Sequence, residues 1–184
     1  MLRAAGSSSG SNPPVSYGTW SITNVAPSVA ATIQNPNVFN KAGANNNWWV
    51  KDDAAVNFYN YWDANQTTTG NADKAIVKTV YDPCPAGYCI PCGNAFLGFS
   101  TSNGGGWDKG YVWDDRYFPA AGYRNDISGG LYSVGSNGNY WLASSSSQTL
   151  AYGLYFYSGN VYPQYGGYRA YGFSVCPVRV LELI

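Results

Sequence analysis

The chain has 184 residues, of which only 11% are charged and 17% are aromatic, and its ten basic residues balance its ten acidic ones. A net charge of zero gives no sign of the basic surface that most nucleic-acid-binding domains need, so we expect no nucleic-acid partner. The sequence has no apolar run of about 18 residues, so a membrane-spanning helix and direct membrane insertion are not expected.

Residues 1–15 are rich in Ser, Gly and Pro, and they are interpreted as a flexible leader or linker. This segment lacks the apolar stretch of a secretory signal. Residues 16–184 are expected to form one domain. Its many Gly, Ser and Asn residues indicate short strands joined by turns.

The first two thirds of the domain predict strands, loops and one clear helix candidate. Short apolar stretches between Asn and Pro residues indicate strands and loops over residues 17–49. The segment Ala54–Ala64 is compatible with a short helix or with an aromatic loop. A strand is predicted at Ala75–Tyr81, and a short helix at Gly93–Phe99, where the apolar residues fall on one side.

Further strands are predicted at Tyr111–Phe118, Tyr140–Ala143 and Gly172–Leu183. The clearest hairpin spans Tyr152–Tyr162, with its turn at Ser158–Asn160. Alternation along this hairpin assigns one set of residues to the core and another to solvent. The core set is Leu154, Phe156 and Val161, and the solvent set is Tyr155, Tyr157 and Tyr162.

An uncharged, tyrosine-rich stretch lies in the C-terminal third of the chain. No charged residue occurs between Asp126 and Arg169, and eight of the seventeen tyrosines lie from Tyr140 to Tyr171. Depletion of charge and enrichment of tyrosine are typical of the centre of a binding interface. The alternative is a pair of strands whose tyrosines pack against the rest of the fold.

Six motifs resemble those of a known group of proteins when they are taken in this order. They are YDPCPAGY (Tyr81–Tyr88), IPCGNAFLGF (Ile90–Phe99), YFPAAGYRN (Tyr117–Asn125), GLYSVGSNGNYW (Gly130–Trp141), AYGLYFYSGNVYPQ (Ala151–Gln164) and RAYGFSVCPVR (Arg169–Arg179). The chain resembles the major-paralogous-domain surface proteins of gut Bacteroidetes and the related C-type-lectin-like variable proteins of diversity-generating retroelements. The resemblance covers residues 75–180, with a looser similarity from Tyr17.

The resemblance implies an α+β fold of the C-type lectin type: mostly antiparallel strands, two short helices and long loops, with a displayed face near the C-terminus. It also implies a variable region at about residues 139–173. Diversification acts at adenines, which turns asparagine codons into many others but not into those for Lys, Glu, Met, Trp or Gln. Residues 139–171 contain no Lys, Glu or Met. Trp141, Gln148 and Gln164 would then be fixed positions. The expected ligand-contacting positions are Asn139, Gly153, Tyr155, Tyr157, Asn160, Tyr162, Tyr165, Gly166, Gly167, Tyr168 and Tyr171.

The resulting expectation is a non-enzymatic recognition or adhesion domain at the surface of a cell or virion. It would display its tyrosine-rich face to a protein or glycan on another cell or on a phage host, as part of a larger surface protein or a pilus. A structural subunit that buries the same face during assembly is the alternative. The calcium- and sugar-binding triplets EPN, QPD and WND of animal lectins are absent, so no calcium-dependent sugar site is expected.

The four cysteines, Cys84, Cys89, Cys92 and Cys176, leave several interpretations open. Their spacing superficially matches a plant-type iron–sulfur pattern, and four thiolates could also hold zinc. An exported domain with an even number of cysteines favours disulfides, and we expect no metal and no cofactor. The relatives usually carry other residues at Cys89 and Cys176, which suggests that these two pair with each other and Cys84 with Cys92.

An enzyme is the least favoured interpretation. The chain contains no histidine, which is the commonest general base and the base of most catalytic triads. The pairs Asp52–Asp53 and Asp114–Asp115 could suggest a glycosidase, but neighbours on a strand point to opposite faces. Solvated loop acids are the expected role of both pairs.

Overall fold

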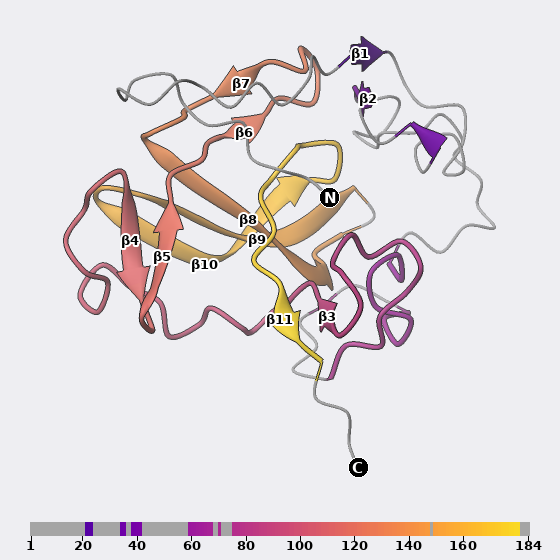
Figure 1. Ribbon diagram of the computed structural model, residues 1–184, viewed down its shortest axis with the longest axis horizontal. Coiled ribbons are helices and arrows are strands. Elements are labelled where there is room, and N and C mark those ends of the chain that lie inside the picture. Colours follow the sequence, from indigo (N-terminus) through magenta and orange to yellow (C-terminus); the bar gives the residue numbers. More distant parts are fainter. Residues whose placement is uncertain are drawn as a thin grey trace.

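The computed structural model describes residues 21–23, 34–35, 38–41, 59–67, 70, 75–147 and 149–180. The expected linker, the Asp52–Asp53 pair, residues 54–58 of the Ala54–Ala64 segment and Gln148 lie outside these ranges. The described residues form eleven short strands in small, mostly antiparallel sheets joined by long loops (Figure 1). The two expected short helices are not among these elements, and within the same ranges no helix is long and apolar enough to cross a membrane.

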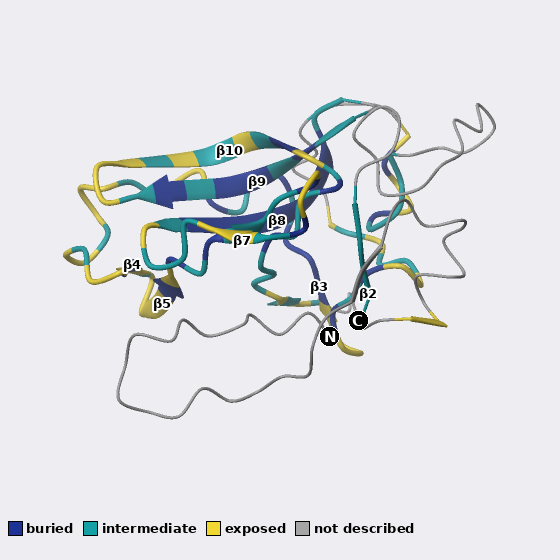
Figure 2. Ribbon diagram, turned by 90° about the horizontal axis from the view of Figure 1, so that it is seen from above, coloured by how far each residue is buried: buried dark blue, intermediate teal, exposed yellow. Residues whose placement is uncertain are grey.

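A three-stranded antiparallel sheet forms the centre of the molecule, in the order β10-β9-β8. Its strands are β8 (Asn137–Ser145), β9 (Leu150–Tyr157) and β10 (Asn160–Tyr168). Burial falls across the sheet, from an almost fully buried β8 to a β10 that is mostly half-buried or exposed (Figure 2). This gradient makes β10 the strand that the sheet displays.

One face of this sheet carries the larger part of the core. Tyr140, Leu142, Leu154 and Phe156 project from β8 and β9 into a buried cluster completed by Phe96, Phe99, Tyr111 and Phe118. The rings meet mostly edge to face, with Phe96 and Phe118 at a centroid distance of 5.6 Å and an interplanar angle of 89°. This geometry is the one that aromatic quadrupoles prefer.

The opposite face of the sheet is covered over part of its length. Trp141, Ala143 and Ala151 pack there with Phe173, Ile90 and Cys84. Trp141 and Phe173 stack with ring centroids 4.2 Å apart. The segment that carries Phe173 also covers the outer edge of β8, because Trp141 N donates to Ser174 O at 2.9 Å.

A β-bulge in β10 changes which side chains share a face. Tyr162 lies opposite Tyr155, whereas Tyr165 lies opposite Gly153, so two residues of β10 face one residue of β9 between these pairs. Tyr162 and Tyr165 are an odd number of residues apart and would point to opposite faces on a regular strand. The bulge brings both tyrosines to the same face, and it contains Pro163, which has no N–H to donate to a sheet.

The predicted hairpin at Tyr152–Tyr162 is confirmed, as β9 and β10 with a turn between Tyr157 and Asn160. Leu154 and Phe156 are completely buried, and Val161 packs against the core that they form. Tyr162 is 43% exposed, and Tyr155 and Tyr157 are half-buried. The predicted strand at Tyr140–Ala143 is also confirmed, as part of the longer β8.

Two-stranded pairs surround the central sheet. They are the parallel pair β1 (Ser21–Thr23) with β2 (Val38–Asn40), and the antiparallel pairs β3 (Tyr88–Cys89) with β11 (Val178–Arg179), β4 (Gly110–Trp113) with β5 (Arg116–Pro119), and β6 (Tyr123–Arg124) with β7 (Leu131–Tyr132). The β3–β11 pair joins the middle of the chain to its C-terminal part.

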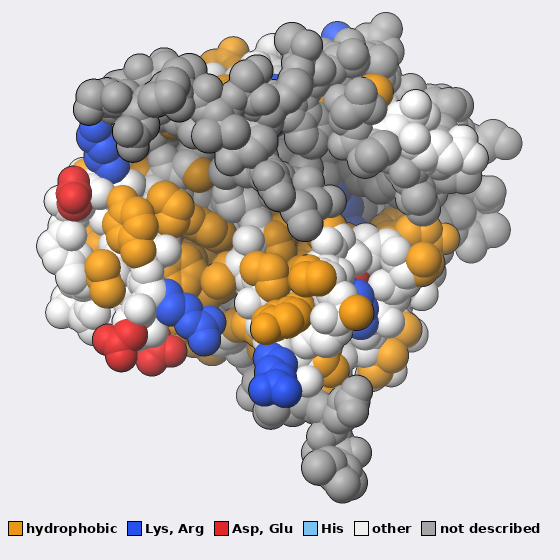
Figure 3. Space-filling view, in the orientation of Figure 1, with side chains coloured by type: hydrophobic (Ala, Val, Ile, Leu, Met, Phe, Trp, Pro, Cys, Tyr) orange, Lys and Arg blue, Asp and Glu red, His pale blue; other side chains and the backbone are white. Residues whose placement is uncertain are grey.

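The single strand predicted at Tyr111–Phe118 is wrong, because the chain turns at its centre. Asp114 and Asp115 both have positive φ, 49° and 56°, and link β4 to β5. Positive φ at both central residues defines the type I′ turn. Asp is tolerated at these positions, but Asn-Gly is the stronger sequence signal for this turn. Asp114 and Asp115 are both exposed, as expected for solvated loop acids. In Figure 3, acidic side chains form a patch where Figure 1 shows the end of the β4–β5 hairpin.

The strand predicted at Ala75–Tyr81 is also wrong. One backbone bridge joins Lys78 to Asp63, and the chain turns immediately afterwards. Lys78 is held through its side chain, since its Nζ donates to Asp82 Oδ1 at 3.1 Å, to Cys84 O at 2.5 Å and to Tyr88 O at 2.8 Å. The carboxylate of Asp82 accepts the N–H groups of Cys84 and Ile90.

The short helix predicted at Gly93–Phe99 is a run of turns. Its backbone bonds span three residues, from Ala95 N to Cys92 O and from Phe99 N to Phe96 O, and do not continue into an α-helical ladder. Phe96 and Phe99 are nevertheless buried. The strand predicted at Gly172–Leu183 is shorter than expected, since β11 comprises only Val178–Arg179. Residues 181–183 of the prediction lie outside the described ranges.

Gly138 gives a stability test of the core. A Cβ at this position would lie 2.0 Å from the ring of Phe156, which is completely buried. We expect Gly138→Ala to lower the free energy of unfolding by about 1–3 kcal/mol, because overpacking displaces that ring. Gly106→Ala is the matched control, since a Cβ there meets nothing within 4 Å. Equal denaturant midpoints for the two variants would contradict this account of the core.

Candidate recognition site

Four tyrosines from β9 and β10 form one continuous aromatic surface, which we call the tyrosine face: Tyr155, Tyr157, Tyr162 and Tyr165. Tyr155 is at its centre and contacts the other three rings, with centroid distances of 5.9 Å to Tyr157, 5.5 Å to Tyr162 and 5.0 Å to Tyr165. Tyr162 and Tyr165 are 43% and 41% exposed. The rings therefore support one another while they present hydroxyls and edges to solvent.

Asparagine amides hold two of these rings in place. Asn137 Nδ2 donates to Tyr155 Oη at 3.3 Å, and Asn160 Nδ2 donates to Tyr157 Oη at 2.7 Å. Both asparagines lie directly opposite Tyr157 on the neighbouring strands β8 and β10. The phenol positions thus follow from the strand register.

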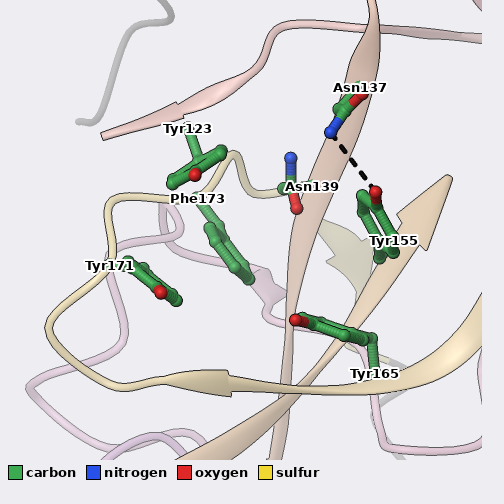
Figure 4. A pocket seen from close by; sticks show the side chains of 7 residues that line it. All are labelled: Tyr123, Asn137, Asn139, Tyr155, Tyr165, Tyr171 and Phe173. Atoms are coloured by element: carbon green, nitrogen blue, oxygen red, sulfur yellow. Dashed lines mark hydrogen bonds between the residues drawn. The ribbon is translucent and has the colours of Figure 1, made fainter. Parts of the chain in front are cut away.

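A pocket of about 120 Å³ lies beside the tyrosine face. Figure 4 shows Tyr165 reaching from β10 toward Asn139 and Phe173, with its hydroxyl directed into the space between them. The lining residues come from β6, the central sheet and the segment after β10, and they are Tyr123, Asn137, Asn139, Tyr155, Tyr165, Tyr171 and Phe173. None of these side chains carries a charge at neutral pH.

The environment of the pocket favours neutral phenols. Burial raises the pKa of Tyr171 to about 12, and the charge of Asp126 and the neighbouring tyrosines add to this effect. Burial also raises the pKa of Tyr155, with further contributions from Tyr157, Tyr165 and Tyr162. The site can therefore offer hydrogen-bond donors and aromatic surface, but it has no general base or nucleophile that ionises near neutral pH.

The structure brings most of the expected contact residues together, in two groups. Tyr155, Tyr157, Tyr162 and Tyr165 form the tyrosine face, with Asn160 exposed at its end. Tyr168 and Tyr171 contact each other at 5.5 Å, and Tyr171 also lines the pocket. Asn139 is buried and lines the pocket as well, with its amide nitrogen 3.4 Å from Gly122 O.

The three expected glycine positions do not all lie on the surface. Gly153 and Gly167 are buried, and Gly166 is half-buried. A Cβ at Gly167 would lie 2.8 Å from the ring of Phe173, and one at Gly153 would lie 2.9 Å from Tyr140 O. Gly167 therefore leaves the space that Phe173 fills, and Gly153 allows the backbone of Tyr140 to come close, so both glycines have a structural role in the site.

Three pocket residues were not expected from the sequence: Tyr123, Asn137 and Phe173. Asn137 could have been found, because it lies two positions before Asn139 and therefore shares its face of the strand. Tyr123 and Phe173 carry no such signal. They come from outside the sheet and meet through a ring contact of 6.3 Å that local periodicity does not predict.

The four cysteines are free thiols in the structure, and neither expected disulfide is formed. Cys84 belongs to the cluster around Trp141, whereas Cys176 packs against the core on the other face of the sheet. Burial raises the pKa of Cys84 to about 12, and a hydrogen bond with Asp82 adds to the shift. A protonated thiol is a weak nucleophile.

Within the ranges that the structure describes, no group of three or more His, Cys, Asp or Glu side chains is placed to hold a metal ion. Comparisons of the chain with protein-family models, with curated proteins and with solved structures found no match in any of the three.

The raised pKa of Tyr171 gives a titration that can be measured. We expect this phenol to ionise near pH 12 in the folded protein, two units above the ordinary value of 10.0, because the fold favours its neutral form. Its contribution to stability is complete below pH 10 and is lost as the pH rises through 12. The ionisation of Tyr171 is measured as the difference in ultraviolet phenolate absorbance between the wild type and Tyr171→Phe across the pH titration. Circular dichroism verifies that both proteins stay folded. Ionisation of this tyrosine near pH 10 in the folded protein would contradict the burial assigned to it.

Proposed function

We propose that this chain is a non-enzymatic recognition domain that binds a protein or glycan on another cell, or on a phage host, through its tyrosine face. The observation that carries the proposal is the cluster of four partly exposed tyrosines on one face of the sheet. Tyrosine is enriched at the centre of binding interfaces, where charged residues are depleted.

The packing of the tyrosine face supports binding with a small loss of conformational entropy. Tyr155 is in ring contact with three neighbours, and two of the phenols accept hydrogen bonds from asparagine amides. Side chains that are held before a partner arrives lose little freedom on binding. Tyrosine has few rotatable bonds and combines apolar area with a polar group, which is why antibody paratopes use it heavily.

The C-type-lectin-like fold and the kinship with retroelement-diversified proteins are part of this proposal, and they rest on the six sequence motifs. Small antiparallel sheets with long loops agree with such a fold. The exposed positions Tyr162, Tyr165, Tyr168 and Asn160 can change without disturbing the core. Gly153 and Gly167 are different, because any side chain there meets Phe173 or the backbone of Tyr140, so we expect them to stay constant.

A recognition domain of this kind acts at a cell or virion surface, as part of a larger surface protein or a pilus. The competing function is a structural subunit that buries the tyrosine face against a neighbouring copy. The two functions differ in solution behaviour, because a binding domain is a monomer with an accessible tyrosine face and an obligate subunit assembles. Sedimentation of the purified chain therefore distinguishes them.

Truncation of the tyrosine face tests the proposal directly. We expect the double variant Tyr157→Ala, Tyr162→Ala to lose about tenfold or more of its saturable binding to intact cells, because it removes two interface rings. The measurement is flow cytometry of the labelled protein on a panel of bacterial and epithelial cells, with unlabelled protein as competitor. The thermal midpoint should change little, since both rings lie outside the buried core.

Tyr88→Ala is the matched control, because Tyr88 is also 43% exposed but lies on β3, away from the tyrosine face. It should bind cells as the wild type does. Equal loss of binding in both variants would overturn the assignment of the surface. A wild type that sediments as an assembly, and that the double variant converts to monomers, would establish the structural subunit instead.

A further inference from the structure

The hydrogen-bond donors and acceptors that line the pocket beside the tyrosine face restrict which ligands can bind there. The hydroxyls of Tyr123, Tyr165 and Tyr171 line the pocket, and they form no hydrogen bond with any residue that the structure describes. Tyr155 Oη accepts a hydrogen bond from Asn137 and keeps its own proton to donate. Figure 4 shows the amide oxygen of Asn139 on the side of Tyr165, where it can accept.

A phenol hydroxyl both donates and accepts, whereas an amide oxygen only accepts. A ligand that satisfies four phenols and an amide within about 120 Å³ must itself carry several groups that donate and accept at close spacing. Alcohol hydroxyls meet this requirement. The volume accommodates several water molecules, and so a fragment about the size of one ring, but not a folded element of a protein.

The packing of the rings argues against a charged ligand. A cation would need free aromatic faces, as in quaternary-ammonium cages. The faces here are used between protein rings: Phe173 stacks on Trp141 and on Tyr171, Tyr155 on Tyr162, and Tyr123 on Tyr132. An anion would need a cationic partner, and the lining contains no Lys or Arg.

We propose that this pocket binds one neutral pyranose unit of a glycan, without calcium, through the hydroxyls of Tyr165, Tyr171, Tyr123 and Tyr155 and the amide oxygen of Asn139. The C–H groups of the sugar pack against the edges of the same rings. This inference rests on the proposed recognition function and narrows it, since it makes a glycan the part of the target that enters the pocket. The tyrosine face lies beside the pocket and contacts the rest of the target.

Binding of simple glycosides tests the proposal. The probes are the methyl glycosides of glucose, galactose, mannose and fucose, followed by saturation-transfer NMR and by titration of the labelled protein in the presence of a chelator. We expect at least one of them to bind with a Kd on the order of 1 mM, which is typical for a single ring. Choline and the methyl glycoside of sialic acid are the charged comparisons and should bind at least about tenfold more weakly.

Hydroxyl deletion locates the sugar. Tyr165→Phe and Tyr171→Phe keep each ring and remove one hydrogen-bonding group, so each should weaken binding by roughly 2- to 10-fold. Tyr132→Phe is the matched control, because Tyr132 stacks on Tyr123 but does not line the pocket, and it should leave binding unchanged. Thermal midpoints near the wild-type value show that the variants fold.

The outcomes separate this inference from the function on which it rests. No saturable binding of any neutral glycoside, stronger binding of choline or sialic acid, or affinities insensitive to both pocket variants would each overturn the sugar pocket. If the sugar pocket fails these tests but the double variant Tyr157→Ala, Tyr162→Ala loses cell binding as expected, the proposed recognition function still stands. Glycoside binding that responds to Tyr165→Phe supports the pocket even if cell binding does not depend on Tyr157 and Tyr162.

Discussion

The bulge between Tyr162 and Tyr165 is the constraint on which the displayed surface depends. A regular strand would direct these two rings to opposite faces, and the extra residue brings both onto the face that carries Tyr155. The bulge is anchored from outside the sheet, because Gln164 Nε2 donates to Gly93 O at 3.0 Å and to Asn94 Oδ1 at 2.8 Å. The turn segment after Cys92 therefore helps to determine which tyrosines meet.

Aromatic packing and backbone hydrogen bonds hold a chain that has few charges. The described ion pair Lys78–Asp82 holds the loop that follows it. Lys78 Nζ also donates to the backbone oxygens of Cys84 and Tyr88, and the carboxylate accepts two backbone N–H groups of the same loop. The rings of Phe99 and Phe156 brace the back of the central sheet, with their centroids 5.8 Å apart. A sheet supported in this way is a rigid platform for the tyrosines on its other side.

The same aromatic contacts also determine the chemistry of the pocket. Phe173 packs on Trp141 in space that Gly167 leaves, since a Cβ at Gly167 would lie 2.8 Å from the Phe173 ring, and Tyr171 in turn stacks on Phe173. Rings that stack on one another give up their faces and leave hydroxyls and edges for a ligand. A glycine with no contact chemistry of its own thus helps to shape a site that is neutral and rich in hydroxyl groups.

Local sequence was sufficient to determine the β9–β10 hairpin and its sidedness, because Leu154 and Phe156 alternate with Tyr155 and Tyr157 and the turn residues separate them. It also located the uncharged, tyrosine-rich stretch, of which Tyr162, Tyr165 and Tyr168 are exposed. Local patterns failed at two places for different reasons. The side chain of Lys78 takes the place of a strand ladder, and Asp114 and Asp115 adopt positive φ in a tight turn that strand periodicity does not detect. The pocket belongs wholly to the tertiary structure, since Tyr123, Asn139 and Phe173 meet only after three separate segments have packed. Periodicity describes one element at a time, and it contains no information on how the side chains of different elements pack together.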